Sequence, residues 1–410
     1  MAPSDSSRTH NQTRRKTVVA FGGESPEHEV SVITALQAMD ALKSTNYLDL
    51  VPFYVSKQGE WFTGEALFSI DSYQDLPKLT ASLSRCTFRK DPLLGACMEV
   101  ESTSSFSWFG SRPNRIPLDV VVMAFHGAAG ENGAFQGLFE TVGVPYTGSG
   151  VLSSSTGMNK VTAKKLAMAA GVEVVPWIDF SEQEWVADQE SFETKASKIG
   201  FPLIVKPVHL GSSIGISTAS TPEEFRRAVE MCLRFDAHVM AEKKIEPLLE
   251  INCSVLGNGA DSRASVCERP MGTDEILSFS DKYLTGGSKG MASTSRVIPA
   301  DISTDLTRKI QEQARILFRE LECAGVARFD FILKGTTENA SEVYFNEVNT
   351  IPGSFSFYLW KESGLHFGPL LLELISIAKR VHNTRSGRSF SFENNLLKHR
   401  QKYGSKKLGK

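Results

Sequence analysis

Two carboxylates and an amide near the end of the chain have the types and spacing of ligands for a hard divalent cation. Arg328-Phe-Asp330-Phe alternates polar and apolar residues, so Arg328 and Asp330 face one side of a predicted strand. Glu347 and Asn349, also two apart, follow on the next strand after a polar turn at 335–341. Together these oxygens suit Mg²⁺ with nucleotide phosphates completing its shell. The alternative is an exposed sheet face with ordinary ion pairs, such as Arg328 with Glu347.

A second group of candidate residues lies where an apolar strand ends at Lys206. The loop that follows is rich in glycine and serine and carries Gly211, Ser212 and Ser213. Backbone N–H groups and hydroxyls of such a loop can surround a phosphate, and glycine lets the backbone approach it closely. No Gly-Lys-Ser/Thr follows the glycines, so this is not a Walker A motif. A plain turn is the alternative interpretation.

Three further polar positions allow two interpretations each. His126 ends an apolar strand, where it is either a catalytic base or a loop histidine. Glu27 begins a predicted helix, where it is either a favourable acid at the helix N-terminus or a carboxylate that binds an amine. Tyr283 lies in the polar, glycine-rich segment 280–291, which is either an active-site lid or a plain surface loop.

The elements that must position these groups begin with a predicted parallel α/β domain. Segments 17–21, 50–54 and 120–125 are short apolar strands, and apolar spacing predicts a helix over 31–42. Strand, glycine turn and helix in alternation indicate a parallel sheet with ligands at the carboxyl ends of its strands. Residues 64–116 are rich in serine and threonine, and we expect an irregular excursion there.

The second half of the chain reads as two α+β lobes. Its predicted strands are largely antiparallel, because the connections are too short for crossover helices. They cover 172–175, 203–205, 239–242, 250–256, 263–267, 326–333 and 342–346, with helices at 223–234 and 306–321. The expected divisions are a disordered tail (1–16), an N-terminal α/β domain (17–150), a central lobe (151–235), a C-terminal lobe (236–385) and a basic tail (386–410).

Composition excludes several classes of protein. The formal net charge of −2, from 45 basic and 47 acidic residues, does not indicate a nucleic-acid or membrane-surface protein. No apolar run approaches the ~18–20 residues that span a bilayer. Six scattered cysteines without a C-x-x-C pair argue against a zinc site or a disulfide scaffold. The first sixteen residues have no apolar core of a signal peptide, so we expect a cytoplasmic protein.

Taken in order, eight motifs resemble the D-alanine–D-alanine ligase family within the ATP-grasp superfamily, from about residue 17 to 380. They are Gly22-Gly-x-Ser-x-Glu27-His-Glu-Val-Ser31, His126-Gly-x-x-Gly-Glu-x-Gly133, Pro145-Tyr-Thr-Gly-Ser-Gly150, Met158-x-Lys160, Val205-Lys-Pro-x-x-x-Gly-Ser-Ser213, Asp281-Lys-Tyr-Leu284, Arg328-x-Asp330 and Asn346-Glu-x-Asn-Thr350. The resemblance implies a three-lobed ATP-grasp fold that clamps ATP between the central and C-terminal lobes.

The resemblance also implies roles for individual residues. ATP contacts are expected from Lys160, Lys206, Ser213, Lys282, Glu242 (adenine) and Glu250 (ribose). Two Mg²⁺ ions, with Mn²⁺ as an alternative, are expected on Asp330, Glu347 and Asn349. Substrates are expected to meet Glu27, Ser212, Tyr283, Arg328, the Gly353 N–H and His126. A homodimer is also implied.

The chemistry implied is carboxylate–amine ligation. The first amino acid's carboxylate attacks the γ-phosphorus of ATP, and the second amino acid's amine attacks the acyl-phosphate. The segment after Gly353 is shorter and more aromatic than the family's, and Ser356 is the candidate for its missing serine. Three readings stay open: D-alanyl-D-alanine synthesis, ligation of a different amino acid or of a specialised metabolite, and a non-catalytic nucleotide-binding scaffold.

Overall fold

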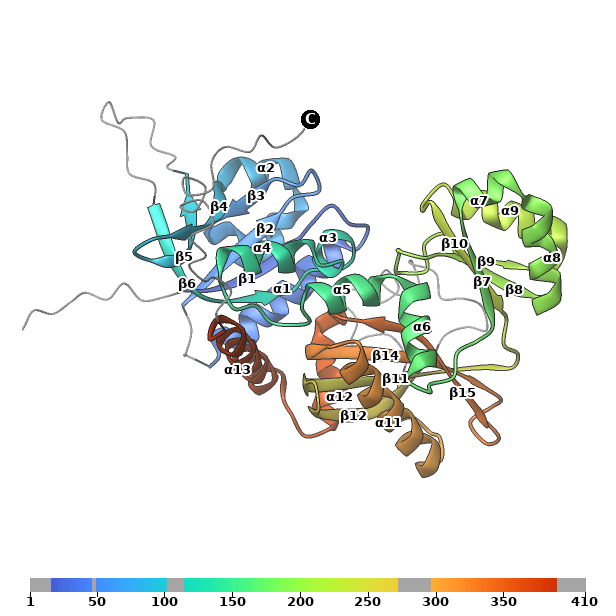
Figure 1. Ribbon diagram of the computed structural model, residues 1–410. Helices are drawn as coiled ribbons and strands as arrows, with labels where there is room; N and C mark the ends of the chain where they lie inside the picture. Colours follow the sequence, from blue (N-terminus) through green and yellow to red (C-terminus); the bar gives the residue numbers. More distant parts are fainter. Residues whose placement is uncertain (1–15, 46–48, 102–113, 272–295, 389–410) are drawn as a thin grey trace, which may run out of the picture.

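The computed structural model describes residues 16–45, 49–101, 114–271 and 296–388. These form three lobes, drawn in Figure 1 in blue to teal, in green, and in yellow to red. Within the described ranges, no helix is both long and apolar enough to cross a membrane.

The N-terminal domain is built around a short parallel sheet. Strand β1 (Lys16–Gly22) pairs in parallel with β2 (Leu50–Val55) on one side and with β6 (Asn114–Met123) on the other. Helix α1 (His28–Lys43) packs on β1, and its buried face includes Ala35 and Met39. The predicted parallel α/β unit is confirmed for these three strands.

The prediction of an irregular excursion at 64–116 is wrong for most of its described part. Strands β3 (Trp61–Thr63), β4 (Ser84–Asp91) and β5 (Gly95–Val100) form an antiparallel series that closes the sheet into a barrel with β2 and β6. Helix α2 (Leu76–Ser82) and two short 3-10 turns precede β4. In β4, buried Cys86 and Phe88 alternate with exposed neighbours, as in a strand with one face on the core.

The central lobe has a four-stranded sheet in the order β7 (Trp177–Ser181), β10 (His238–Lys243), β8 (Leu203–Pro207) and β9 (Ser217–Ala219). Three helices supply the rest of its core: α7 (Glu182–Ala187), α8 (Gln189–Ile199) and α9 (Pro222–Cys232). The expected boundary at 236 would assign β10 to the last lobe. Its pairing with β7 and β8 moves the boundary of the central sheet beyond Lys243.

The C-terminal lobe is an antiparallel sheet in the order β13 (Arg296–Val297), β12 (Asp261–Pro270), β11 (Leu248–Asn258), β14 (Ala324–Lys334) and β15 (Glu342–Asn349). Helices α11 (Thr304–Glu320) and α6 (Lys160–Ala169) share its core. The predicted strand at 172–175 is wrong, because that segment makes only an isolated bridge from Val174 to Phe345.

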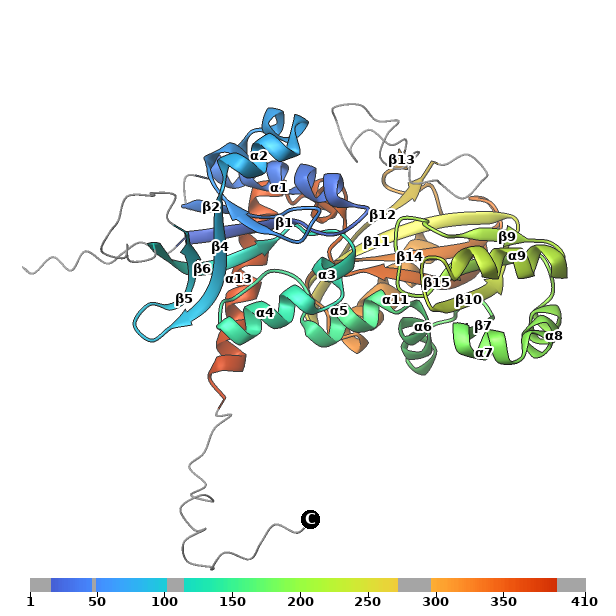
Figure 2. The same cartoon turned by 90° about the horizontal axis from the view of Figure 1, so that it is seen from above.

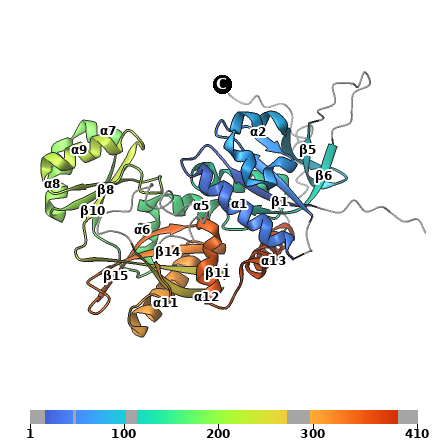
Figure 3. The same ribbon diagram turned by 180° about the vertical axis from the view of Figure 1, so that it is seen from behind.

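Shorter helices join the lobes. Helices α3 (Ala128–Glu131), α4 (Ala134–Val142) and α5 (Val151–Met158) follow β6, and Figure 2 shows α4, α5 and α6 leading from the N-terminal domain toward the other lobes. After β15 come a 3-10 turn (Gly353–Ser356), α12 (Phe357–Glu362) and α13 (Phe367–Ser386). Figure 3 shows α13 beside α1, so the last helix packs against the first domain.

Candidate active site

The strand pair β14–β15 gathers four of the predicted site residues. Asp330 is directly opposite Glu347, and Arg328 is directly opposite Asn349. Arg328 Nε and Nη2 donate to the two carboxylate oxygens of Asp330, each over 2.7 Å. Asn349 Nδ2 also donates to Asp330 Oδ2 over 3.1 Å. The alternative ion pair of Arg328 with Glu347 does not form here, because the arginine is held by Asp330 on its own strand.

This cluster gathers two carboxylates and an amide on one face of the strand pair. Burial raises the pKa of Asp330; Arg328 opposes this, and the charges of Glu347 and Glu268 add to it. A cation near these carboxylates would relieve that repulsion. In the described part of the chain, no group of three or more His, Cys, Asp and Glu side chains has metal-binding geometry. A Mg²⁺ ion at Asp330 and Glu347 would need Asn349 and nucleotide phosphates to complete its shell.

A buried ion triad links helix α6 to two strands of the central sheet. Glu242, on β10, is 2.9 Å from Lys164 Nζ and 2.5 Å from Lys206 Nζ. All three side chains are at most 5 % exposed. Lys206 Nζ also donates to Asn346 Oδ1 of β15 over 3.1 Å. The triad therefore joins the central sheet to the strand that carries Glu347 and Asn349.

Lys160 is the first residue of α6 and is nearly buried. The side chain of Asn159 caps this helix by accepting a hydrogen bond from Thr162 N. Lys160 Nζ donates to the Leu210 carbonyl over 2.5 Å and lies 3.5 Å from Glu347 Oε2. One lysine thus contacts both the loop after β8 and the carboxylate face.

The same loop reaches the N-terminal domain. Ser212 and Ser213 both have left-handed backbone angles, with φ of 55° and 59°. Ser212 Oγ donates to Glu27 Oε1. Glu27 is the residue before α1, and its side chain does not cap that helix. The alternative role of Glu27 as a capping acid is therefore not seen, and its carboxylate faces the loop instead.

His126 is buried between two polar groups. Its Nε2 is 2.8 Å from Thr34 Oγ1 of α1, and its Nδ1 is 3.8 Å from Glu131. Thr34 Oγ1 also accepts a hydrogen bond from Ser354 N over 3.3 Å. The histidine is 4 % exposed, so it supports the wall between the first helix and the turn after Gly353.

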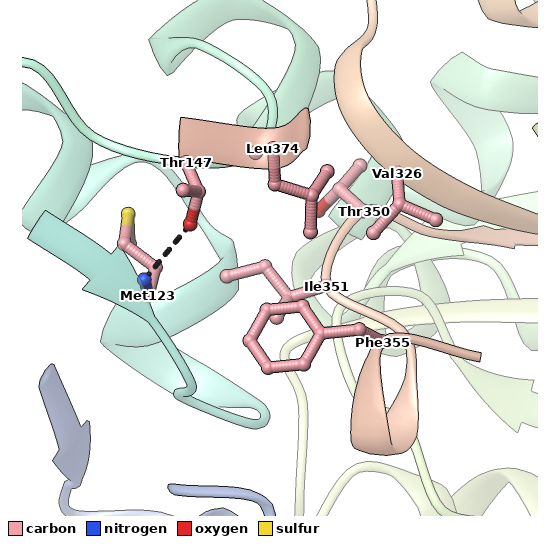
Figure 4. A pocket seen from close by; sticks show the side chains of 8 residues that line it. Met123, Thr147, Val326, Thr350, Ile351, Phe355 and Leu374 are labelled. Atoms are coloured by element: carbon pink, nitrogen blue, oxygen red, sulfur yellow. Dashed lines mark hydrogen bonds between the residues drawn. The ribbon is translucent and has the colours of Figure 1, made fainter. Parts of the chain in front are cut away.

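The turn after Gly353 has an unusual backbone. Ser354, Phe355 and Ser356 have φ of 47°, 57° and 51°, although none is glycine. Phe355 points into the junction between lobes beside Ile351, Met123 and Leu374, where only a void of about 10 Å³ remains (Figure 4). Ser356 Oγ is fully buried and has no hydrogen-bond partner among the described residues. An unpartnered buried hydroxyl is costly and is suited to a ligand.

Helix α12 brings polar groups near Arg328 that sequence reasoning did not assign to the site. Tyr358 Oη donates to Glu268 Oε1 over 2.9 Å, and Arg296 Nη1 donates to Glu268 Oε2 over 3.0 Å. The Arg296 guanidinium lies 4.0 Å from the centre of the Tyr358 ring. Burial, with the charge of Glu268, raises the pKa of Tyr358 to about 12. Trp360 Nε1 donates to Ser254 Oγ, opposite Arg328. The aromatic composition of 355–360 was the available signal.

The remaining predicted residues are Tyr283, Lys282, Glu250 and Gly353. Tyr283 and Lys282 lie outside the described residues. Glu250 is exposed on β11, and Gly353 begins the 3-10 turn.

Replacing Thr34 by valine should cost about 1–3 kcal/mol of unfolding free energy, because buried His126 and the Ser354 N–H would lose their shared partner. Urea unfolding followed by circular dichroism would measure it. Thr141→Val is the matched control, because the exposed Thr141 hydroxyl bonds only to the helix backbone at Gly137. Equal stability of the two variants would show that the Thr34 bridge contributes nothing.

The fold has the three-lobed architecture of ATP-grasp enzymes. Family profiles match nearly the whole described chain: "D-ala D-ala ligase N-terminus" over residues 16–149 and "D-ala D-ala ligase C-terminus" over residues 166–376. The chain belongs to the D-alanine–D-alanine ligase family.

Individual relatives and solved structures are similar to the chain over most of its length. The chain is 35% identical to the D-alanine–D-alanine ligase of Thermosipho melanesiensis, over 93% of this chain and 97% of that one. It is 33% identical to that of Natranaerobius thermophilus, over 91% and 98%. Among solved structures, the D-alanine-D-alanine ligase from Coxiella burnetii superimposes with a TM-score of 0.74 at 27% identity, over 95% and 98%. The VanG D-Ala:D-Ser ligase from Enterococcus faecalis gives 0.72 at 28%, over 89% and 99%.

Proposed function

We propose that this protein is an ADP-forming ligase that joins D-alanine to D-alanine through an acyl-phosphate. One observation carries the proposal: the loop after β8 connects a candidate amine-binding carboxylate to a candidate phosphate-binding lysine. Its Ser212 bonds to Glu27, its Leu210 carbonyl bonds to Lys160, and Lys160 lies beside Glu347. Donor amino acid, γ-phosphate and metal-binding face would then meet within one continuous set of contacts.

Charged and polar residues of three segments and the β14–β15 strand pair would form the nucleotide half of the site. Lys160, Lys206, Ser213 and Lys282 would neutralise phosphate charge, Glu242 would lie near the adenine, and Glu250 would bind the ribose. Asp330, Glu347 and Asn349 would hold two Mg²⁺ ions. When bound, the metal would supply neutralisation of the charge that develops on the transferred phosphoryl group.

The protein's own groups would orient the two amino acids. Glu27, supported by the Ser212 hydroxyl, would hold the donor ammonium so that its carboxylate faces the nucleotide. Arg328 and the Gly353 N–H would bind the oxyanion formed when the acceptor amine attacks. Arg328 is already fixed by Asp330, so little reorganisation is needed. Tyr283 would complete the network over the substrates and help to exclude water.

The residues expected around the acceptor amino acid support a second candidate for that substrate. The solved VanG relative is described as a D-Ala:D-Ser ligase. In this chain, the unpartnered Ser356 hydroxyl and the Tyr358–Glu268 pair lie where the family's longer segment would be. Ser356 is the candidate for the acceptor carboxylate, and a hydroxyl-bearing acceptor is the alternative to D-alanine. His126 would act on the acceptor wall indirectly, through Thr34 and Ser354.

The remaining properties follow from family membership. We propose a homodimer in the cytoplasm that acts on free amino acids and binds neither nucleic acid nor membrane. A non-catalytic scaffold is the competing class of function. It is less well supported, because every predicted nucleotide-site residue that the structure describes keeps its charged or polar side chain.

A phosphate-release assay with MgATP and a panel of amino acids tests the proposal. D-alanine alone should give strong release and a product with the mass of D-alanyl-D-alanine. Release only with a mixture of D-alanine and D-serine would favour the second acceptor. ATP binding without release for any amino acid pair would point to the scaffold.

Glu27→Gln should raise the donor KM by roughly 10–100-fold, because the amide cannot pair with an ammonium as a charged partner can. The ATP KM should change less than about threefold. Steady-state kinetics with varied D-alanine at saturating ATP would measure both. Glu29→Gln is the control, since the exposed Glu29 pairs only with Lys57. An unchanged donor KM in Glu27→Gln would refute the assignment.

A further inference from the structure

Three successive residues after β8 bind the N-terminus of helix α6. Lys160 N donates to the Val208 carbonyl over 3.2 Å, and Lys160 Nζ donates to the Leu210 carbonyl over 2.5 Å. Between these two contacts, His209 Nε2 lies 2.9 Å from Asn159 Nδ2. Helix α6 packs in the core of the C-terminal lobe, whereas β8 belongs to the central sheet. The contacts therefore join the two lobes at the start of the candidate phosphate-binding loop.

The orientation of the Asn159 amide is fixed by the helix that it caps. Asn159 Oδ1 accepts a hydrogen bond from Thr162 N over 2.8 Å, and a backbone N–H can only donate. The Nδ2 group therefore points to His209 as a donor. Because two donors cannot bond to each other, His209 Nε2 must be the unprotonated, accepting nitrogen of the ring.

The other ring nitrogen of His209 is on a carboxylate. His209 Nδ1 lies 3.0 Å from Asp236 Oδ2, which also accepts a hydrogen bond from His209 N over 2.7 Å. His238 N donates to Asp236 Oδ1 over 3.1 Å. Burial by itself would raise the pKa of Asp236, but the hydrogen bonds from His209 and His238 outweigh it and lower that pKa. The ionised carboxylate accepts from Nδ1–H, so the bonds around the ring suit the neutral Nδ1–H tautomer.

The other charged groups around this ring bind partners of their own. The ring of His238 on β10 is 6.0 Å away between centroids, and its Nε2 lies 3.2 Å from Asp179 of β7. Lys165 of α6 is 4.0 Å from the same carboxylate, and Lys160 lies beside Glu347. The His209 side chain itself is 45% exposed, so protons from solvent reach it.

We propose that His209 is a positioning residue of the nucleotide site and that its neutral form fixes the phosphate-binding loop to α6. The inference rests on the proposed function, because this loop and Lys160 are expected to meet the phosphates. A proton on Nε2 would set two donors against each other and break the bond to Asn159, unless the amide turned and gave up its cap of α6. Nucleotide affinity should therefore fall as the pH falls through the range in which histidine takes up a proton.

Two substitutions of His209 separate its two side-chain bonds. His209→Gln places an amide oxygen near the position of Nε2, so it can accept from Asn159 and does not titrate. His209→Asn places its amide near the position of Nδ1, so it keeps the bond to Asp236 and loses the one to Asn159. Both positions are at the protein surface, where neither change disturbs a core.

Isothermal titration calorimetry of the full chain with Mg²⁺ and the non-hydrolysable ATP analogue AMPPNP tests the inference. At about pH 8.5, the wild type and His209→Gln should bind within about twofold of each other, and His209→Asn at least about threefold more weakly. At about pH 5.5, the wild type should also bind at least about threefold more weakly than His209→Gln. Comparison with His209→Gln at each pH cancels the titration of the analogue itself.

Asn159→Asp should reverse the sign of the pH effect. Aspartate caps a helix as well as asparagine does, but its carboxylate can only accept, so it bonds to the ring when Nε2 carries a proton. Relative to His209→Gln, this variant should bind the analogue more tightly at about pH 5.5 than at about pH 8.5. The wild-type direction of change in Asn159→Asp would contradict the inference.

The neighbouring histidine provides the control. His238→Gln should keep the pH dependence of the wild type, and its loss in that variant would assign the titration to His238 and overturn the inference. Equal binding by the wild type, His209→Gln and His209→Asn at both pH values would also overturn it and leave the nucleotide site standing. No binding of the analogue by the wild type at either pH would overturn the proposed function, and the inference with it.

Discussion

Asp330→Asn should lower turnover by at least roughly 10³-fold, which is the largest effect on activity expected for a single atom change in this protein. The substitution keeps the shape of the side chain but removes its charge. It would take one carboxylate from the proposed metal site and leave the Arg328 guanidinium, fixed by two 2.7 Å bonds, without its counter-ion. Phosphate release at saturating ATP and D-alanine would measure it.

Asp301→Asn provides a control with nearly the same geometry. Asp301 binds Arg269 through two bonds of 2.6 and 2.7 Å on the outside of the C-terminal lobe. Its loss should leave turnover within twofold. Thermal unfolding of both variants separates an effect on folding from an effect on catalysis. Turnover of Asp330→Asn within 10-fold of the wild type would exclude Asp330 as a metal ligand.

Glu242→Gln should have the largest effect on stability, at about 3–5 kcal/mol of unfolding free energy. Glu242 is the carboxylate that Lys164 and Lys206 share, and the three side chains are almost completely buried. Its neutralisation would leave two ammonium groups in the interior with no counter-charge. Chemical unfolding at pH 7 would measure the loss. Glu193→Gln is the control, because its pair with Arg226 is more exposed and lies on the outer surface.

The loss should depend on pH in a defined direction. Burial by itself would raise the pKa of Glu242, but Lys164 and Lys206 outweigh it and lower the pKa below the ordinary value of 4.5. A depressed carboxyl pKa contributes stability above the unfolded-state value, and that stability is lost as the pH falls through the folded-state value. The difference between wild type and Glu242→Gln should shrink as the pH falls below 4.5. A difference that grows toward acid would contradict it.

Local patterns predicted much of the fold and which residues face one another on β14 and β15. Alternation along Arg328-Phe-Asp330-Phe fixed which side chains share a face, and the short polar turn fixed the neighbour strand, so the pairing of Asp330 with Glu347 followed. The parallel strands around β1 were equally predictable, because near-continuous apolar runs are typical of buried parallel strands.

Long-range pairings were not predictable in the same way. From its residues alone, strand β10 could join either the central or the C-terminal sheet. The bond from Thr34 to Ser354 joins residues 320 positions apart, and that from Tyr358 to Glu268 joins residues 90 apart. Such contacts depend on how whole lobes dock. Sequence spacing therefore predicted local strand pairing better than contacts between distant segments.

The left-handed turn at Ser354, Phe355 and Ser356 depends on contacts with the N-terminal domain. Each non-glycine residue in that conformation costs about 1–2 kcal/mol, so the isolated segment would not adopt it. It is held from outside, by bonds from Ser354 to Thr34 and Gln37 of α1 and by burial of Phe355. Helix α1 thus holds a segment more than three hundred residues later in the conformation of this turn. A C-terminal half produced alone would lack the contacts with α1 that hold this turn.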